Sequence, residues 1–355
     1  MKIDIDIFGN YRLGECFIDD VFAKKFFFAL IISYTETCKV PGITMAGSAM
    51  DLMELTSPSD AEFINYGYCK NMAYIPMTPD GKPTPAIITK TMLDKSNIPH
   101  ITINSGSKIA PKIPYIETSI PYGNNIFHMP GLDIHSFLSA INYGKIMGNT
   151  LSLSNDCLVI GESIPGGTTT ALAVLKGLGI NAQVSSSMPN NPLNLKNKIV
   201  NAALSRLNTK DPFSMVSNLG DPMIPFVAGM VSTASKNANV ILAGGTQMAA
   251  VLALAKHVGY EKKKLSLATT QYVINDQSAN FTNMVKQIDD LPIFTAKLKL
   301  ENSKHSAIRS YSDGFVKDGA GAGGATVAAI LYKQFKANDL LDRLDKNYCL
   351  LLNSY

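Results

Sequence analysis

The sequence predicts an α/β fold in which helices cover both faces of a mostly parallel sheet. In the second half of the chain, short apolar runs alternate with stretches of helical character of about 12 residues, a pattern typical of parallel sheets. Glycine-containing turns mark the ends of three apolar runs, at Gly106, Gly161 and Gly244. Because ligands bind beyond the carboxyl ends of parallel strands, we expect these turns at one ligand-binding edge.

The first part of the chain has a less regular pattern. Residues 1–7 alternate apolar and acidic side chains, as an edge strand does, and do not resemble a signal peptide. The apolar run 26–32 is too short for a bilayer span, which needs about 20 residues, and we interpret it as a core helix or a subunit contact. Residues 59–62 form a capping box, which predicts a helix start. The proline-rich segments 76–85 and 109–122 predict extended surface loops.

From residue 132 onward the elements follow in a regular order. We expect helices at 134–147, 171–179, 195–207, 224–234 and 325–336, and a further helix after Gly244 and Gly245. We expect strands at 157–160, 240–243, 265–269 and 293–300, in addition to an earlier strand that begins at His100.

The composition excludes several classes of protein. With 355 residues, 46% of them hydrophobic and 17% charged, the chain can bury one large domain, or one large and one small. The net charge of +4 and the absence of a basic block longer than Lys262–Lys264 argue against nucleic-acid binding. The five cysteines are dispersed and lack zinc-site spacing, so we expect no metal and a reducing compartment. We therefore expect a soluble, cytoplasmic protein without a membrane span.

The most informative stretch is residues 161–170, between an apolar run and a run of helical character. A strand, a glycine-rich turn and a helix N-terminus bind anions through unpaired N–H groups and the helix dipole. The spacing follows the Walker A pattern, but Gly167 takes the place of the lysine, which argues against a nucleoside triphosphate. The pattern is compatible with a monoester phosphate, with Glu162 at the mouth of the site. The alternative is a tight turn with a threonine-capped helix and no ligand.

A second glycine-rich segment lies near the C-terminus. Gly319, Gly321 and Gly324 match the literal pattern G-x-G-x-x-G, but too few residues follow to complete a dinucleotide-binding unit. Asp318 then lies on a sterically open loop at a helix start, where a ligand can approach the backbone closely. The alternative is that Asp318 caps the helix.

Three blocks of the sequence resemble one enzyme family. Residues 161–169 are similar to the glycine-rich signature of nicotinate-nucleotide:dimethylbenzimidazole phosphoribosyltransferases, and residues 240–252 and 316–322 resemble two further blocks of that family. The blocks occur in the family's order over about residues 150–330. The form of the first block, with Ile-Pro-Gly-Gly in its loop, resembles the archaeal-type branch.

The resemblance implies an architecture and a reaction. It implies a Rossmann-like sheet in a large domain of residues 36–320, a small, mainly helical domain formed by 1–35 with 321–355, and a homodimer. The implied reaction transfers 5-phosphoribosyl from nicotinate mononucleotide to a benzimidazole-type or related N-heterocyclic base. The products are α-ribazole phosphate and nicotinate, as in synthesis of the lower-ligand nucleotide loop of cobamides, and the reaction needs no cofactor.

The resemblance also implies site residues. The family's catalytic glutamate falls on Asp318, whose carboxylate reaches about 1.5 Å less far than that of a glutamate, and its loop glutamate falls on Glu162. The family's phosphate-binding lysine falls on Lys196, with Lys198 as the competing assignment. The remaining residues assigned to phosphate and ribose are Gly166, Gly167, Thr168, Thr169, Thr170, Gly244, Gly245, Gly319 and Gly321.

The acceptor base is expected to bind at the small-residue loop between Gly42 and Met53. Small residues before a carboxylate can form the floor under a flat ligand, and Ser48, Met50 and Asp51 are the candidates. The alternative is a loop packed under a helix.

Two other functions are compatible with the sequence. One is a non-catalytic nucleotide-binding or regulatory protein that keeps the phosphate site but has diverged at the base. The other is an NAD(P)-dependent oxidoreductase, against which the missing dinucleotide fingerprint argues.

Overall fold

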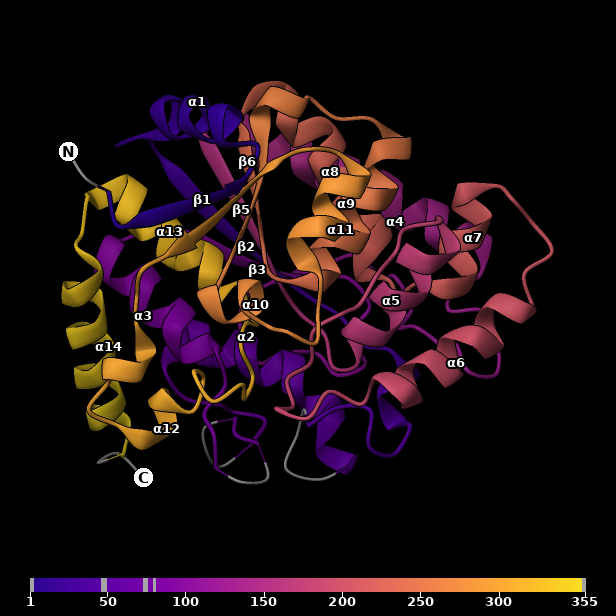
Figure 1. Ribbon diagram of the computed structural model, residues 1–355, viewed down its shortest axis with the longest axis horizontal. Helices are drawn as coiled ribbons and strands as arrows, with labels where there is room; N and C mark the ends of the chain where they lie inside the picture. Colours follow the sequence, from indigo (N-terminus) through magenta and orange to yellow (C-terminus); the bar gives the residue numbers. More distant parts are fainter. Residues whose placement is uncertain (1–2, 46–49, 73–75, 79–80, 353–355) are drawn as a thin grey trace.

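The computed structural model describes residues 3–45, 50–72, 76–78 and 81–352. This part of the chain is built around an eight-stranded sheet, five of whose strands (β1, β2, β3, β5 and β6) are labelled in Figure 1. The strand order is β1-β8-β7-β6-β5-β2-β3-β4. β1 is antiparallel to β8, and all the other neighbours are parallel. The strands are β1 (Ile5–Gly9), β2 (Phe26–Ile32), β3 (His100–Asn104), β4 (Ile116–Glu117), β5 (Cys157–Ser163), β6 (Asn239–Ala243), β7 (Leu265–Thr269) and β8 (Pro292–Ala296).

Helices cover both faces of the sheet. One core contains α4 (Ile134–Ser152), α5 (Gly167–Gly177), α6 (Leu193–Ser205), α7 (Pro212–Leu219), α8 (Met223–Asn237), α9 (Thr246–Val258) and α11 (Phe281–Ile288). The other contains α1 (Tyr11–Val21), α2 (Thr56–Tyr66), α3 (Ala86–Ser96), α13 (Ala322–Lys333) and α14 (Ala337–Leu352). Alternate side chains of a strand supply the two cores, since Leu158 and Ile160 of β5 lie in the first and Val159 in the second. The predicted fold class is confirmed.

The apolar run 26–32, predicted as a core helix or a subunit contact, is a strand. It forms β2, which lies between β5 and β3 and is buried along nearly its whole length. A parallel strand covered on both faces has a continuous apolar run, so periodicity cannot separate it from a buried helix. Among the described residues, no helix is both long enough and apolar enough to cross a membrane.

The first 35 residues contribute strands as well as a helix. Besides α1 they contain β1, which is the edge strand that the alternation of residues 1–7 predicts, and β2, which is internal to the sheet. Both strands belong to the large sheet because they pair with β8 and with β5 and β3. The division of the chain into a large and a small domain stays a prediction.

Two expectations for the segment before α3 differ from the structure. α2 begins at Thr56, so Ser59 and Glu62 lie inside the helix and do not cap its start. The Glu62 carboxylate instead accepts hydrogen bonds from backbone N–H groups at Lys70, Asn71 and Lys112. The end of the proline-rich segment 76–85 is buried and does not form a surface loop, because Thr84 and its neighbours pack inward.

Two glycines let α13 lie unusually close to the sheet. A Cβ atom built on Gly323 would approach the Thr269 backbone to 2.3 Å, and one on Gly324 would approach Ala243 Cβ to 2.2 Å. A side chain at either position would push the helix off the ends of β6 and β7. This packing sets the position of the loop that precedes α13 and carries Asp318.

Candidate active site

The turn between β5 and α5 has the predicted strand, glycine turn and helix. Gly166 has a φ of +77°, and a Cβ atom there would approach Cys38 Cα to 2.9 Å, so only glycine fits this turn. α5 begins at Gly167, and its N-terminus faces the carboxyl edge of the sheet.

Three helix N-termini meet at one pocket on that edge. Its wall includes Gly166, Gly167 and Thr168 at the start of α5, Gly245 and Thr246 at the start of α9, and residues 318–320 just before α13. Each N-terminus presents backbone N–H groups and a partial positive charge. The pocket therefore has the properties of an anion site built from three elements.

Much of the remaining wall is apolar. Methionines from different segments contribute to it, together with other aliphatic side chains, and this group includes Met45, Met72, Met77, Leu52, Ile164 and Val316. Unbranched thioether side chains adapt to flat ligands of different outline. A few polar groups within a mostly apolar wall are typical of small-molecule sites.

Glu162 brings a buried carboxyl group to this pocket. It lies near the end of β5 with 3% of its surface exposed, and it accepts a hydrogen bond from the backbone N–H of Ile164. Burial, followed by the nearby carboxylates of Asp318, Asp221 and Asp60, raises the pKa of Glu162 well above its usual value. The surroundings therefore favour the protonated form of Glu162 more strongly than water does, so this carboxyl group is a candidate for proton transfer.

Asp60 and Asp221 are acidic neighbours that the sequence analysis did not assign to the site. Asp60 lines the pocket and accepts hydrogen bonds from the hydroxyls of Thr84 (2.6 Å) and Ser163 (2.7 Å). Asp221 lies outside the lining and accepts the hydroxyl of Thr170. Burial raises the pKa of each carboxyl to about 6. Asp221 precedes a proline at a helix start, which is a weak signal, whereas nothing local identifies Asp60.

Asp318 lines the pocket, but both of its oxygens are already occupied. One accepts hydrogen bonds from the Thr269 hydroxyl (2.7 Å) and the Thr270 N–H (3.3 Å). The other accepts the N–H groups of Gly319 (2.8 Å) and Gly323 (3.2 Å). These four bonds join the loop to β7 and to the first turn of α13, which is the capping alternative considered from the sequence.

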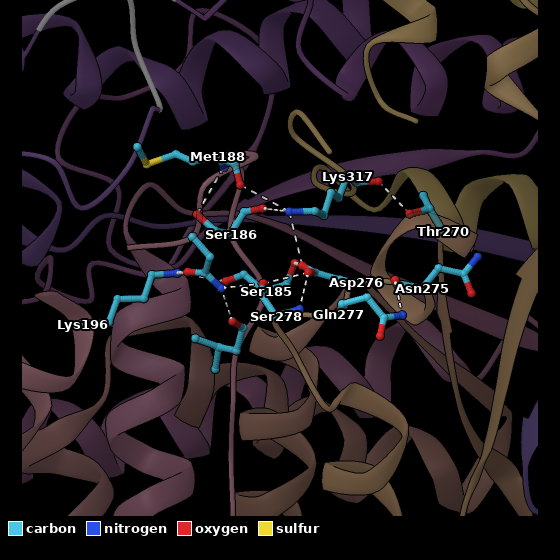
Figure 2. Close-up of polar contacts among 12 residues, drawn as sticks. Ser185, Ser186, Met188, Lys196, Thr270, Asn275, Asp276, Gln277, Ser278 and Lys317 are labelled. Atoms are coloured by element: carbon cyan, nitrogen blue, oxygen red, sulfur yellow. Dashed lines mark hydrogen bonds and ion pairs between the residues drawn. The ribbon is translucent and has the colours of Figure 1, made fainter. Parts of the chain in front are cut away.

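Two buried lysines and an aspartate lie along one wall (Figure 2). Lys317 lines the pocket, and its ammonium group lies 3.2 Å from Asp276 Oδ2 and 2.9 Å from the Ser186 carbonyl oxygen. Lys196 is fully buried behind the wall, and burial together with Lys317 lowers its pKa to about 7. Lys198 is exposed, so neither lysine named from the sequence lines the pocket. Lys317 was not predicted as a site residue from the sequence, where the only indication of such a role is its position next to Asp318.

Several other residues assigned to phosphate and ribose lie behind the lining. Thr169 and Thr170 are buried in α5, and Gly244 lies beneath Glu162, because an added Cβ would come within 3.5 Å of its Oε1. Gly321 packs against Gly161 and the Phe28 ring. These glycines therefore shape the floor of the pocket without lining it.

The predicted base-binding residues fall at the limit of the described chain. Ser48 lies outside the described residues, and Met50 and Asp51 begin the short helix η2 (Met50–Leu55), whose Leu52 lines the pocket. For metals, the described ranges contain no group of three or more His, Cys, Asp or Glu side chains placed to hold an ion.

A family model described as phosphoribosyltransferase matches residues 99–307, more than half of the chain. The chain belongs to this phosphoribosyltransferase family. The resemblance stated from the three sequence blocks, and the enzyme class that it implies, are confirmed.

Archaeal relatives match nearly the whole phosphoribosyltransferase chain. A UPF0284 protein of Archaeoglobus fulgidus is 42% identical and covers 90% of this chain and 92% of its own length. A UPF0284 protein of Sulfolobus acidocaldarius is 39% identical, with coverage of 92% and 96%. These names state no substrate.

Two solved structures from Thermus thermophilus share the fold. The nicotinate-nucleotide-dimethylbenzimidazole phosphoribosyltransferase of this organism has a TM-score of 0.59, 14% identity, and coverage of 88% of this chain and 84% of its own. A second structure from the organism, described as CobT, has a TM-score of 0.61 and 14% identity, with coverage of 91% and 90%. At this identity the likeness supports the fold.

Proposed function

We propose that this phosphoribosyltransferase transfers the 5-phosphoribosyl group of nicotinate mononucleotide to a benzimidazole-type or related N-heterocyclic base. The products are an α-ribazole phosphate and nicotinate. We further propose that the enzyme is cytoplasmic, as its composition indicates, and a homodimer, as the resemblance implies.

The observation that carries the proposal is the separation of charge within one pocket. The N-termini of α5, α9 and α13 converge at the pocket and favour an anion such as a monoester phosphate. The pocket also has an acidic group, in which burial and three nearby carboxyl groups raise the pKa of Glu162. These carboxyl groups belong to Asp318, Asp221 and Asp60. A donor with a phosphate at one end and a cationic pyridinium ring at the other complements both features.

The chemistry of the transfer makes use of this acidic group. A ring nitrogen of the acceptor attacks C1′ of the ribose, and the bond from C1′ to the pyridinium nitrogen breaks. The electron pair of that bond stays on the leaving nitrogen and neutralises the positive charge of the pyridinium ring. Positive charge develops on the ribose, which passes through an oxocarbenium-like state. Nearby carboxylates stabilise that developing positive charge. The acceptor's second ring nitrogen then has to lose its proton.

We assign proton acceptance to Glu162 and the fixing of the loop to Asp318. The side-chain oxygens of Asp318 already accept four hydrogen bonds, which fill the positions at which a carboxylate accepts. Glu162 has a single backbone partner and a raised pKa, and it lines the pocket. A carboxylate whose oxygens retain open acceptor positions can take the proton of the acceptor base.

The experiment is incubation of the purified protein with nicotinate mononucleotide and benzimidazole or 5,6-dimethylbenzimidazole. We expect nicotinate and a base ribotide to form together in equal amounts, as measured by liquid chromatography with mass spectrometry. A panel of purines and other azoles, run in parallel, identifies the preferred acceptor. Absence of a ribotide with every acceptor would refute the transferase reaction.

The alternative of a non-catalytic nucleotide-binding protein gives a different result. It predicts that nicotinate mononucleotide binds in calorimetry but that no acceptor yields a product. Under that alternative, Asp318→Glu, which restores the family's residue, also fails to produce turnover.

A further inference from the structure

The wall segment 185–188 lies between α5 and α6 in the chain and includes three consecutive serines. Ser185, Ser186 and Ser187 all line the pocket, and they belong to none of the three helix N-termini that meet there. Figure 2 shows Lys196 and Lys317 reaching this segment from different parts of the chain. The segment is therefore held by contacts with distant parts of the chain and not by regular secondary structure.

Every carbonyl group of the segment accepts a hydrogen bond from the protein. Lys196 Nζ donates to the carbonyl of Ser185 (2.9 Å), and Lys317 Nζ donates to those of Ser186 (2.9 Å) and Met188 (3.3 Å). The backbone N–H of Val316 donates to the carbonyl of Ser187 (2.8 Å). Two ammonium groups and one amide thus fix the orientation of successive peptide groups.

The N–H groups of the same peptides are left without acceptors. In a trans peptide, the N–H of a residue points opposite the preceding carbonyl, so fixing the carbonyls of Ser185 and Ser186 also fixes the N–H groups of Ser186 and Ser187. Within the described part of the chain, no acceptor lies at the backbone N–H of Ser185, Ser186 or Ser187. Nearly all buried backbone N–H groups have a partner, so free ones in a pocket wall indicate a ligand acceptor.

We propose that the backbone N–H groups of residues 185–187 form a further wall of the phosphate site, and that Lys196 and Lys317 are positioning residues that orient those of Ser186 and Ser187. The identity of the phosphate ester rests on the proposed function. In this arrangement the lysines act through the peptide groups, which explains why Lys196 belongs to the site without lining the pocket.

The charge behind the wall agrees with an anion in front of it. Asp276 offsets one of the two lysines, and the hydroxyls of Ser185 (2.6 Å) and Ser278 (2.7 Å) hold its carboxylate in place. Lys196, whose pKa is about 7, adds positive charge as the pH falls below that value. An ammonium group bonded to a carbonyl also polarises that peptide and strengthens its N–H as a donor.

The test is calorimetric binding of inorganic phosphate and of nicotinate mononucleotide to the full chain. Lys317→Met removes one ammonium group but leaves Asp276 buried and unpaired, which by itself threatens folding. The double variant Lys317→Met/Asp276→Asn removes both charges. We expect the double variant to recover most of the melting temperature lost in Lys317→Met, while its phosphate affinity stays at least tenfold below wild type.

A purely structural role for Lys317 predicts the opposite, with phosphate affinity returning along with stability in the double variant. Lys196→Met should also weaken phosphate binding, whereas Lys198→Met is the matched control on the same helix and should not, because Lys198 is exposed. Normal phosphate binding in both the double variant and Lys196→Met would overturn the inference, as would a wild-type protein that binds no phosphate.

The same measurements separate the two proposals. If the wild-type protein binds phosphate but makes no ribotide, the proposed function fails and the positioning inference stands. If the wild-type protein makes ribotide but the lysine variants bind phosphate normally, only the inference fails.

Discussion

At the scale of single residues, two carboxyl groups of the same pocket have different surroundings. The sequence places Glu162 and Asp318 beside glycine-rich turns and assigns catalysis to both. In the structure, burial raises the pKa of both carboxyl groups, but Asp318 accepts four hydrogen bonds whereas Glu162 has a single backbone partner. Two of the four donors to Asp318, Thr269 and Thr270, are distant in sequence, as are the acidic neighbours of Glu162, so local pattern could not reveal the full difference.

Glu162→Gln should abolish proton acceptance while keeping the size of the side chain. We expect kcat to fall by about 10²- to 10⁴-fold, the range for loss of a general base, with KM for nicotinate mononucleotide changed only a few-fold. Steady-state kinetics with nicotinate mononucleotide and a benzimidazole measure both. Asp318→Asn serves as the comparison and should lower the melting temperature together with the rate. Full activity in Glu162→Gln would exclude it as the base.

Asp60→Asn tests the cost of burying an acidic side chain beside the pocket. Burial raises the pKa of Asp60 from 3.8 to about 6, so between these pH values the folded protein binds more protons than the unfolded chain. The contribution of Asp60 to stability therefore falls as pH rises through this window and stays low above pH 6. We expect Asp60→Asn to be more stable than wild type at pH 7.5 by about 1–3 kcal/mol.

Urea unfolding at pH 4 and pH 7.5 checks the Asp60 prediction. The stability difference between Asp60→Asn and wild type should shrink towards pH 4, where the carboxyl group is protonated in the folded state. A variant less stable than wild type at both pH values would show that the hydrogen bonds from Thr84 and Ser163 outweigh the burial of charge.

At the scale of elements, the two ends of α5 use glycine for different reasons. Gly166 before the helix and Gly179 after it have nearly the same left-handed backbone, with φ of +77° and +79°. A Cβ atom on Gly166 would collide with the backbone of Cys38 at 2.9 Å, while one on Gly179 would meet nothing within 4 Å. The first glycine is required by both conformation and packing, the second by conformation alone.

Gly166→Ala and Gly179→Ala therefore form a matched pair. Gly179→Ala should cost about 1–2 kcal/mol of unfolding free energy, the strain of a left-handed alanine. Gly166→Ala should cost more and should also weaken binding of nicotinate mononucleotide, because the turn that carries the α5 N-terminus has to move. Chemical denaturation and calorimetry measure the two effects. Equal stability losses with unchanged binding in both variants would contradict this account of the turn.

At the scale of the whole molecule, the sheet gathers strands from both ends of the chain. β1 pairs in antiparallel register with β8, and β2 lies next to β5 at the middle of the sheet. The edge at β8 is thus closed by the first strand of the chain. An exposed edge strand presents unpaired backbone groups that promote association between chains.

Removal of residues 1–10 should open that edge. We expect a lower melting temperature and a rise in aggregated material, because β8 loses its hydrogen-bonding neighbour. Thermal unfolding and size-exclusion chromatography measure these effects. A truncated protein as stable and as monodisperse as the full chain would show that β1 contributes little to the fold.

Much of the fold could be predicted because its signals are local. β7 occupies the predicted range 265–269, and the strand, turn and helix around Gly166 lie where the pattern placed them. The run 26–32 could not be assigned, since a strand buried on both faces and a buried helix have the same apolar composition. Lys196 was named from the resemblance, but only the packed structure places it behind the pocket wall.

By itself, the sequence determined the alternating elements, the glycine turns at the strand ends and the family, because apolar periodicity and short motifs depend on neighbouring residues. Tertiary structure alone decided which charged groups meet. Lys317 donates a hydrogen bond to the carbonyl of Ser186, which is 131 residues away in the sequence. Asp60 accepts one from the hydroxyl of Ser163, which is 103 residues away. Such contacts form only when the folded sheet places the carboxyl ends of its parallel strands side by side at one edge. The roles of the acidic and basic groups at this pocket therefore follow from packing.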